Sequence, residues 1–185
     1  KLIGGMRNGV ARISRIVKGL KIFAHQDTGE LKPCDVNECI AQALELCNNK
    51  LKNKVAVETC FADGMPSIVG DMQQLEQVFV NLIVNAADAL EDRPDAKIII
   101  TTSQEATAFR ITVQDNGRGI PERILKDIWK PFYTTKEVGK GTGLGLPIVL
   151  GIIESHKGTI TVENIQPNGT CFTIVLPLRT EENTT

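Results

Sequence analysis

Aromatic residues and histidines are scarce in this chain. Only 4% of its 185 residues are Phe, Trp or Tyr, and only two are histidine. Two histidines leave little material for a metal centre or for catalysis that depends on imidazole. The charge is nearly balanced, with 21 basic and 22 acidic residues, and no basic stripe is interleaved with aromatics. Because nucleic-acid binding relies on such a stripe, we expect no nucleic-acid partner.

Long hydrophobic runs are absent too. No segment approaches the roughly 20 apolar residues that cross a bilayer, and no signal peptide is visible. The five cysteines show neither a C-x-x-C pair nor zinc spacing: Cys34, Cys39, Cys47, Cys60 and Cys171. Four of them have apolar neighbours, as reduced cysteines have when they pack as small hydrophobes. We expect a reducing, cytoplasmic location without membrane contact from this part, although the full-length protein can carry a membrane anchor.

The first 30 residues are expected to form a unit of their own. Hydrophobic residues recur at alternating four- and three-residue steps from Met6 to Ala24, which is coiled-coil spacing. This pattern predicts one helix over residues 2–26 that packs against a partner helix. An amphipathic helix lying on its own domain is the alternative. Gly29 and Pro33 are expected to end the element.

The rest of the chain, 42% hydrophobic overall, can bury one good core. The predicted elements are helices over about 35–51, 71–91 and 144–156, and strands over 55–61, 67–69, 97–102, 108–114, 159–163 and 170–176. We expect an α+β fold, a two-layer sandwich with helices covering one face of a mixed sheet, over residues 31–179. Residues 180–185 are expected to form a loose tail.

The helix predicted over 71–91 carries a narrow polar stripe. One side of it presents four polar residues: Gln77, Asn81, Asn85 and Asp88. Hydrophobic residues border this stripe on both edges, whereas a solvated face would be broader and richer in Lys and Glu. A buried amide without a partner costs about 1–3 kcal/mol. The stripe therefore either pairs internally or faces a polar pocket.

A second candidate feature follows the strand predicted over 108–114. Asp115, Gly117 and Gly119 belong to the run D-N-G-R-G-I. A carboxylate at a strand end, beside glycines that let a ligand approach the backbone, suits recognition of a base or an amide group. The same run is typical of a tight turn, and by itself it does not decide between the two readings.

A glycine-rich run opens the helix predicted over 144–156. It reads G-K-G-T-G-L-G-L over residues 139–146. Glycines at a helix N-terminus expose backbone N–H groups, where hydrogen bonds and the helix dipole both favour a phosphate. The run has neither the spacing of a Walker A loop nor the preceding strand of a Rossmann fingerprint. It predicts a phosphate site of another kind.

The order of four motifs resembles that of sensor histidine kinases. The runs N-L-I-V-N-A-A-D-A, D-N-G-R-G-I, K-P-F-Y-T-T-K and G-K-G-T-G-L-G-L are similar to their N, G1, F and G2 boxes. The wider relatives are the GHKL superfamily, which shares the Bergerat fold, and N-A-x-D-A resembles its nitrogen-regulation type. The resemblance covers roughly Leu31 to Leu178. Residues 1–30 resemble the second helix of the dimerisation and phosphotransfer hairpin, with its linker.

The resemblance implies ATP and Mg²⁺ as ligands and gives residues roles. Asn85 matches the asparagine that helps to hold the metal, and Asn81 is expected to face the triphosphate. Asp115 matches the acid that hydrogen-bonds the adenine amino group. The implied catalytic residues are Asn81, Asn85 and Lys136. The implied nucleotide-binding residues are Asn81, Asn85, Asp115, Gly117, Gly119, Ile120, Phe132, Thr135, Lys136, Lys140, Gly141, Thr142, Gly143, Leu144, Gly145 and Thr170.

Three further side chains are given roles by the same comparison. Phe132 is expected to anchor a lid over residues 121–139. Asp88 stands where many of these kinases have a basic residue, so we expect it to form an internal salt bridge rather than a phosphate contact. His156, near the end of its helix, is expected to be structural.

The implied function is that of the ATP-binding catalytic portion of a two-component sensor histidine kinase. It would donate the γ-phosphate to a histidine on a dimerisation helix outside this chain, for onward transfer to a response-regulator aspartate. The implied partners are that helix, in a homodimer, and a receiver domain. His25 is followed by Gln26 rather than an acid, so we expect this fragment not to phosphorylate itself.

Two other functions stay open at this point. The superfamily's mechanical ATPases have a glutamate general base at the position of Asn81, and an amide cannot accept a proton in that role. Asn81 therefore favours phosphate transfer over hydrolysis. An ATP-hydrolysing conformational clamp and a non-enzymatic nucleotide-binding relative are the alternatives.

Overall fold

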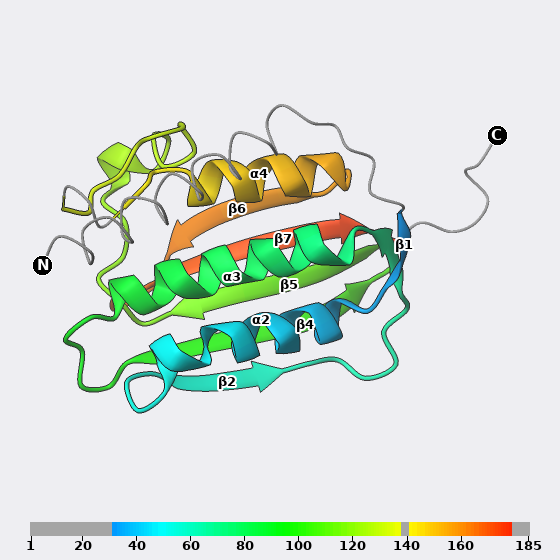
Figure 1. The fold of residues 1–185 in the computed structure, drawn as a ribbon, viewed down its shortest axis with the longest axis horizontal. Helices are drawn as coiled ribbons and strands as arrows, with labels where there is room; N and C mark the ends of the chain where they lie inside the picture. The colour runs from blue at the N-terminus through cyan, green and yellow to red at the C-terminus, as the bar shows by residue number, and fades with distance from the viewer. Residues whose placement is uncertain (1–30, 138–140, 179–185) are drawn as a thin grey trace, which may run out of the picture.

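The computed structural model describes residues 31–137 and 141–178. Within them, three helices lie side by side over one face of a five-stranded sheet (Figure 1). The predicted two-layer α+β sandwich is therefore confirmed. The helix predicted over 2–26 and the tail lie outside the described residues. In the described part, no helix is long and apolar enough to cross a bilayer.

The main sheet is mixed, as predicted. Its strand order is β2 (Ala56–Cys60), β4 (Lys97–Glu105), β5 (Ala108–Asp115), β7 (Thr170–Pro177) and β6 (Thr159–Asn164). β2 and β4 are parallel, and all the other neighbours are antiparallel. The parallel pair is possible because a long crossover that includes a helix separates β2 from β4 along the chain.

A second, two-stranded sheet contains a strand that the sequence did not predict. β1 (Lys32–Cys34) pairs antiparallel with β3 (Ile68–Gly70). β1 has only three residues, and one of them is Pro33, which has no N–H to give to a ladder. Such a strand exists only because its distant partner lies beside it, so no local pattern marks it.

The helices begin where the capping residues predict. Asp35 Oδ1 accepts the N–H groups of Asn37 at 2.8 Å and Glu38 at 3.3 Å, and α2 (Val36–Leu51) follows. Asp71 caps α3 (Met72–Ala89) in the same way. Each cap supplies an acceptor for first-turn donors that have no partner within the helix.

The core lies between α3 and the covered face of the sheet. The apolar side of α3 is fully buried, as expected from its periodicity: Leu75, Val78, Phe79, Leu82, Ile83, Ala86 and Leu90. Alternate residues of the central strands face it, among them Ile98, Ile100, Ile111 and Ile174. Burial of this area is the main source of stability, at about 25 cal/mol per Å² of apolar surface. It also fixes which side of α3 is left for the polar stripe.

His156 joins the ends of two helices, which confirms the structural role expected for it. The ring is 7% exposed and follows α4 (Gly145–Ser155). Its Nε2 accepts the N–H of Asp71 at 3.0 Å, while its Nδ1 lies 2.8 Å from the carbonyl oxygen of Ile152. This geometry requires the neutral ring with the proton on Nδ1. The imidazole thus pins the end of α4 to the start of α3.

Candidate functional site

The polar stripe of α3 lies beneath the first residue of α4. A β-carbon built on Gly145 would lie 3.5 Å from Oδ1 of Asn81 and 3.8 Å from Nδ2 of Asn85. Nδ2 of Asn81 is buried and has no hydrogen-bond partner among the described residues. An orphan buried donor costs free energy unless something accepts from it. Asn81 thus has a buried donor that is available to a ligand.

The N-terminus of α4 adds backbone donors at the same place. Within the described residues, no side chain caps the first turn of this helix. Leu144 is buried, and its N–H has only a long contact of 3.4 Å with Oγ1 of Thr142. The first N–H groups of a helix have no partner within it, and with the helix dipole they favour an anion. Phosphate groups therefore suit this end of the site.

Asp115 lies at the end of β5, with its side chain on the helix-covered face. It is 3% exposed, and its register partner on β7 is Thr170, which is also 3% exposed. Oδ1 of Asp115 accepts the N–H of Gly117 at 2.8 Å. Burial raises the pKa of Asp115 above its usual value, and the N–H groups of Gly117 and Thr170 offset only part of this. A buried, more basic carboxylate is a strong acceptor for an amino group.

The backbone of Gly117 passes too close to its neighbours for any side chain. A β-carbon there would lie 2.7 Å from Oδ1 of Asp115 and 2.9 Å from the carbonyl oxygen of Ala89. The D-N-G-R-G-I run therefore makes the turn that its sequence suggests, and it also brings Asp115 next to the end of α3. The structure thus bears out the tight-turn reading of this motif, and recognition of a base or an amide group by Asp115 stays a prediction.

Asn164 holds the same loop, and sequence reasoning missed it. Its Oδ1 accepts the N–H of Ile120 at 2.8 Å, and its Nδ2 donates to the carbonyl oxygen of Ile120 at 2.7 Å. Asn164 ends β6, some forty residues further along the chain. No local pattern could have linked the two, because the contact depends on the sheet order. Ile120 and Gly119 are thereby fixed beside β6 and β7.

We expect Asn164→Ala to loosen this loop and to weaken ligand binding more than it weakens the fold. Both lost hydrogen bonds are at an exposed position, so the melting temperature should fall by only a few degrees. Affinity for the ligand of this site should fall by about three- to tenfold, because ordering the loop becomes part of binding. Asn164→Asp, which keeps the acceptor but loses the donor, should give an intermediate affinity in calorimetric titration. Equal affinities in all three proteins would contradict this role.

The glycine-rich loop and the predicted lid cross at Gly143 and Phe132. The N–H of Phe132 donates to the carbonyl oxygen of Gly143 at 2.8 Å. Gly143 has a φ of +65°, and a β-carbon there would overlap the backbone of Phe132. Only glycine meets both conditions at position 143. The crossing sets the path of the loop into α4.

Phe132 does not anchor the lid, and this prediction was wrong. Its side chain is 61% exposed. The segment is held instead by Ile128, which is 8% exposed, and by Trp129, whose ring packs edge-on against Phe172 with centroids 6.2 Å apart. Phe132 has a φ of +67°, which a non-glycine residue rarely adopts. The role was carried over from the family resemblance, which matches the residue type but not the backbone conformation at this position.

Lys136 reaches from the predicted lid to the polar stripe of α3. Its Nζ donates to Oδ2 of Asp88 at 2.5 Å and to Oδ1 of Asn85 at 3.3 Å. Asp88 also pairs with Lys50 at the end of α2. Burial raises the pKa of Asp88, but hydrogen bonds from the two lysines outweigh it and hold that pKa below its usual value. The internal salt bridge expected for Asp88 is confirmed.

Three other predicted ligand residues belong to the lid or to the glycine-rich loop: Thr135, Lys140 and Gly141. Gly141 lies against Thr134 and Lys136, so the glycine-rich loop touches the lid there. Thr135 is exposed to solvent. Lys140 lies outside the described residues. The structure therefore brings the asparagine stripe, the loop before α4 and Lys136 together, and connects them through Gly117 to Asp115.

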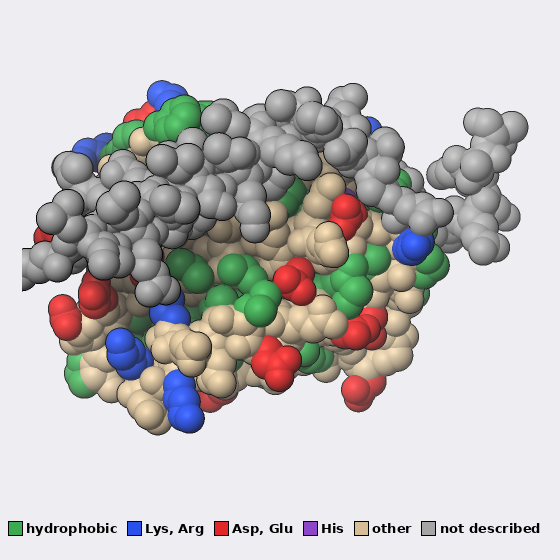
Figure 2. Space-filling view, viewed as in Figure 1, with side chains coloured by type: hydrophobic (Ala, Val, Ile, Leu, Met, Phe, Trp, Pro, Cys, Tyr) green, Lys and Arg blue, Asp and Glu red, His purple; other side chains and the backbone are tan. Residues whose placement is uncertain are grey.

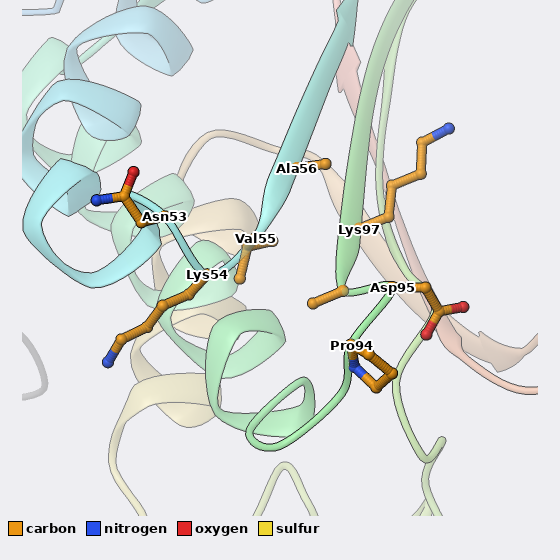
Figure 3. A pocket seen from close by; sticks show the side chains of 8 residues that line it. Asn53, Lys54, Val55, Ala56, Pro94, Asp95 and Lys97 are labelled. Carbon is orange, nitrogen blue, oxygen red and sulfur yellow. The ribbon is translucent and has the colours of Figure 1, made fainter.

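The described surface includes two hollows that share Pro94 and Asp95. One, of about 470 Å³, is lined by Asp88, Ala89 and Arg118 among others and adjoins the end of α3. The other, of about 370 Å³, lies between the starts of β2 and β4 and includes Lys54 and Lys97 (Figure 3). This second hollow contains no residue of the polar stripe. The first hollow includes one residue of the polar stripe, Asp88.

The arrangement suits an elongated ligand with two different ends. Asp115 offers an acceptor at one end, and Asn81 with the start of α4 offers donors at the other. A two-layer fold that holds a glycine-rich loop over an asparagine-bearing helix defines a class of protein, the ATP-binding domains of the GHKL superfamily.

Comparison with known proteins agrees with this class. Residues 70–180 match the family model described as histidine kinase-, DNA gyrase B-, and HSP90-like ATPase. The chain belongs to this family.

Individual relatives that the chain resembles are sensor kinases. It is 38% identical over 176 residues to sporulation kinase C of Bacillus subtilis (strain 168), covering 93% of this chain and 40% of that protein. It is 31% identical over 180 residues to the sensory histidine kinase/phosphatase NtrB of Rhizobium leguminosarum bv. phaseoli, covering 90% and 46%. The chain thus spans less than half the length of these relatives. The match to NtrB agrees with the nitrogen-regulation form of the motif.

A solved structure gives the same fold. The crystal structure of histidine kinase ThkA in complex with response regulator protein TrrA superimposes with a TM-score of 0.76 at 30% identity. The match covers 98% of this chain and 52% of the ThkA chain.

Proposed function

We propose that this chain is the ATP-binding catalytic part of a two-component sensor histidine kinase. It binds ATP with Mg²⁺ and donates the γ-phosphate to a histidine on a dimerisation helix. The observation that carries the proposal is the buried Nδ2 of Asn81, which has no partner in the part of the chain that the structure describes, beneath a start of α4 that no described side chain caps. These donors match a polyphosphate, and the buried carboxylate of Asp115 matches an amino group such as that of adenine.

The metal fits this site as a partner of the nucleotide. Among the described residues, no group of three or more His, Cys, Asp or Glu residues could hold a metal ion. Asn85 supplies a carboxamide oxygen on the stripe, and Mg²⁺ commonly takes few protein ligands, the rest being phosphate oxygens and water. Bound there, Mg²⁺ would neutralise phosphate charge. Asn85 would hold it, while Lys136 would add a positive charge beside it.

The stripe favours phosphate transfer over hydrolysis. Hydrolysis needs a general base that can take a proton from water. Asn81 cannot accept a proton, and Asp88, the carboxylate of the stripe, is occupied by Lys136 and Lys50. With its base absent, water attack on bound ATP is slow, so the phosphate passes to a histidine that docks there. Positioning and charge then supply most of the catalysis.

The proposed partners follow from the kinase assignment. We assign residues 1–30 to the C-terminal helix of the dimerisation hairpin and its linker, and residues 31–179 to the catalytic domain. The full-length protein would be a homodimer. A receiver domain would take the phosphate, and the complex of ThkA with TrrA, which resembles this chain in its kinase part, supports such a partner.

Labelled ATP provides the test. The purified chain is mixed with γ-labelled ATP, Mg²⁺ and a separately prepared dimerisation hairpin that contains the acceptor histidine. We expect label on the hairpin and slow release of free phosphate. Rapid phosphate release without labelled hairpin would instead support the ATP-hydrolysing clamp. Absence of nucleotide binding would contradict both.

A further inference from the structure

Three charged side chains from three elements meet at the end of α3. Oδ2 of Asp88, on α3, accepts a hydrogen bond from Lys136 of the lid segment. Oδ1 of the same carboxylate forms an ion pair with Lys50, in the last turn of α2. The exposed fractions are 25% for Asp88, 29% for Lys136 and 43% for Lys50. We refer to Lys50, Asp88 and Lys136 as the charge triad. Partial burial makes such contacts stronger than fully exposed ion pairs.

Position 88 is an unusual place for an acid in a site built for phosphates. A bare carboxylate one turn from Asn85 would repel a polyphosphate, at a cost that rises as water is excluded. The structure shows that it is not bare, because each oxygen faces an ammonium group. The charge triad carries a net charge of +1, from two lysines and one aspartate. Figure 2 shows Lys and Arg side chains gathered at this end of α2, where Lys50, Lys52 and Lys54 lie.

The contact of Lys136 with Asn85 gives the charge triad a link to the site. A long, flexible side chain on a surface loop loses up to about 2 kcal/mol of rotamer entropy when it is fixed. Asp88 fixes it through a short, charge-assisted hydrogen bond, and this leaves Nζ 3.3 Å from Oδ1 of Asn85. Lys136 is therefore held on the stripe before any ligand arrives.

We propose that Asp88, itself held by Lys50, is a positioning residue that places the Lys136 ammonium beside Asn85 for contact with the phosphates. This inference rests on the proposed function and adds to it the residues that organise the cationic side of the site. When a metal takes the oxygen of Asn85, Lys136 keeps Asp88 as its partner and its charge stays near the phosphates. Asp88 thus favours binding of an anionic ligand indirectly, because it holds the positive charge of Lys136 near the phosphates.

The sign of one mutation separates this role from simple electrostatics. Asp88→Asn removes a negative charge near a polyanion, so charge alone predicts tighter binding. Positioning predicts weaker binding, because Lys136 is released. We expect the affinity of the whole chain for the non-hydrolysable analogue AMPPNP with Mg²⁺ to fall by about five- to tenfold, within the range of couplings between residues in contact. Equilibrium dialysis measures it. Tighter binding would overturn the proposal.

A double-mutant cycle tests whether Asp88 acts through Lys136. Lys136→Met is expected to weaken AMPPNP binding by about tenfold, since a charge near the phosphates is lost. Added to Lys136→Met, Asp88→Asn should weaken binding no further, and Asp88→Glu in the unaltered background should restore most of the affinity. An equal loss from Asp88→Asn in both backgrounds would overturn the proposal, because Asp88 would then act on the fold or the metal directly.

Two controls keep the result interpretable. Glu58→Gln breaks another partly exposed ion pair, with Lys97, and should leave affinity unchanged. If Asp88→Asn does not fold, Lys50→Met takes its place in the cycle. We expect Lys50→Met to weaken AMPPNP binding by about two- to threefold in the unaltered chain and not at all in the Lys136→Met background. An equal loss of affinity in both backgrounds would overturn the proposal. Failure of the unaltered chain to bind AMPPNP at any Mg²⁺ concentration would refute the proposed function instead.

Discussion

Replacing Asp115 with Asn is expected to reduce nucleotide affinity by about 100-fold or more. The variant loses a buried, charge-assisted hydrogen bond to the ligand and buries two mismatched groups in its place. The carboxylate is 3% exposed, and one oxygen accepts from Gly117. In the variant, the amide oxygen can keep that bond. The amide nitrogen then faces the ligand as a donor, opposite the donor of the adenine amino group.

The same variant should change the pH dependence of stability. Because the pKa of Asp115 is raised in the folded protein, ionising this carboxyl costs more free energy in the folded state than in the unfolded state. The folded state therefore loses stability as pH rises above the pKa that the group has in the unfolded chain, and the loss grows until pH passes the pKa in the folded protein. The melting temperature of Asp115→Asn, relative to that of the unaltered chain, should therefore rise between about pH 3 and neutrality. Thermal melts at several pH values measure this.

Asp63→Asn is the matched control, since Asp63 lies in an exposed turn. It should leave both nucleotide affinity and the pH trend unchanged. Undiminished affinity in Asp115→Asn would remove the adenine assignment. A melting-temperature difference that moved the opposite way with pH would show that ionised Asp115 is stabilised by its surroundings.

Asn85→Ala is expected to abolish phosphate transfer, by at least about 100-fold, while the fold survives. The half-buried side chain supplies the carboxamide oxygen assigned to the metal, so its loss removes an interaction that matters most as phosphate charge develops. Alanine is the better helix former by about 0.5 kcal/mol, so α3 should not be destabilised. Lys136 keeps Asp88 as a partner in the variant.

The measurement is label transfer to the dimerisation hairpin, with a thermal melt of each protein. Asn49→Ala, an exposed position on α2, makes the same substitution away from the site and should transfer normally. Full transfer by Asn85→Ala at saturating Mg²⁺ would exclude Asn85 as the metal-holding residue.

Local patterns predicted those parts of the fold that local patterns determine. The buried side of α3, the caps at Asp35 and Asp71 and the succession of α2 to α4 and β2 to β7 along the chain depend on spacing and on neighbours in sequence. The polar stripe was visible for the same reason. What covers it was not, since Gly145 of α4 lies beside Asn81 in space but is distant from it in the sequence.

The features that sequence reasoning missed all join distant residues. β1 pairs with β3, Asn164 clamps Ile120, and Lys50 shares Asp88 with Lys136. None of these contacts produces a periodic pattern of residues in the sequence. The role of Phe132 was predicted wrongly for a related reason, because its backbone turn is imposed by the crossing with Gly143 rather than by its own residue type.

A crystal structure of the chain with AMPPNP and Mg²⁺ tests the central claim most directly. We predict the adenine beside Asp115, phosphate oxygens within hydrogen-bond distance of Asn81 Nδ2 and the first N–H groups of α4, and the metal on Asn85. A nucleotide bound in the hollow between β2 and β4, or one that leaves Nδ2 of Asn81 without a partner, would contradict the account.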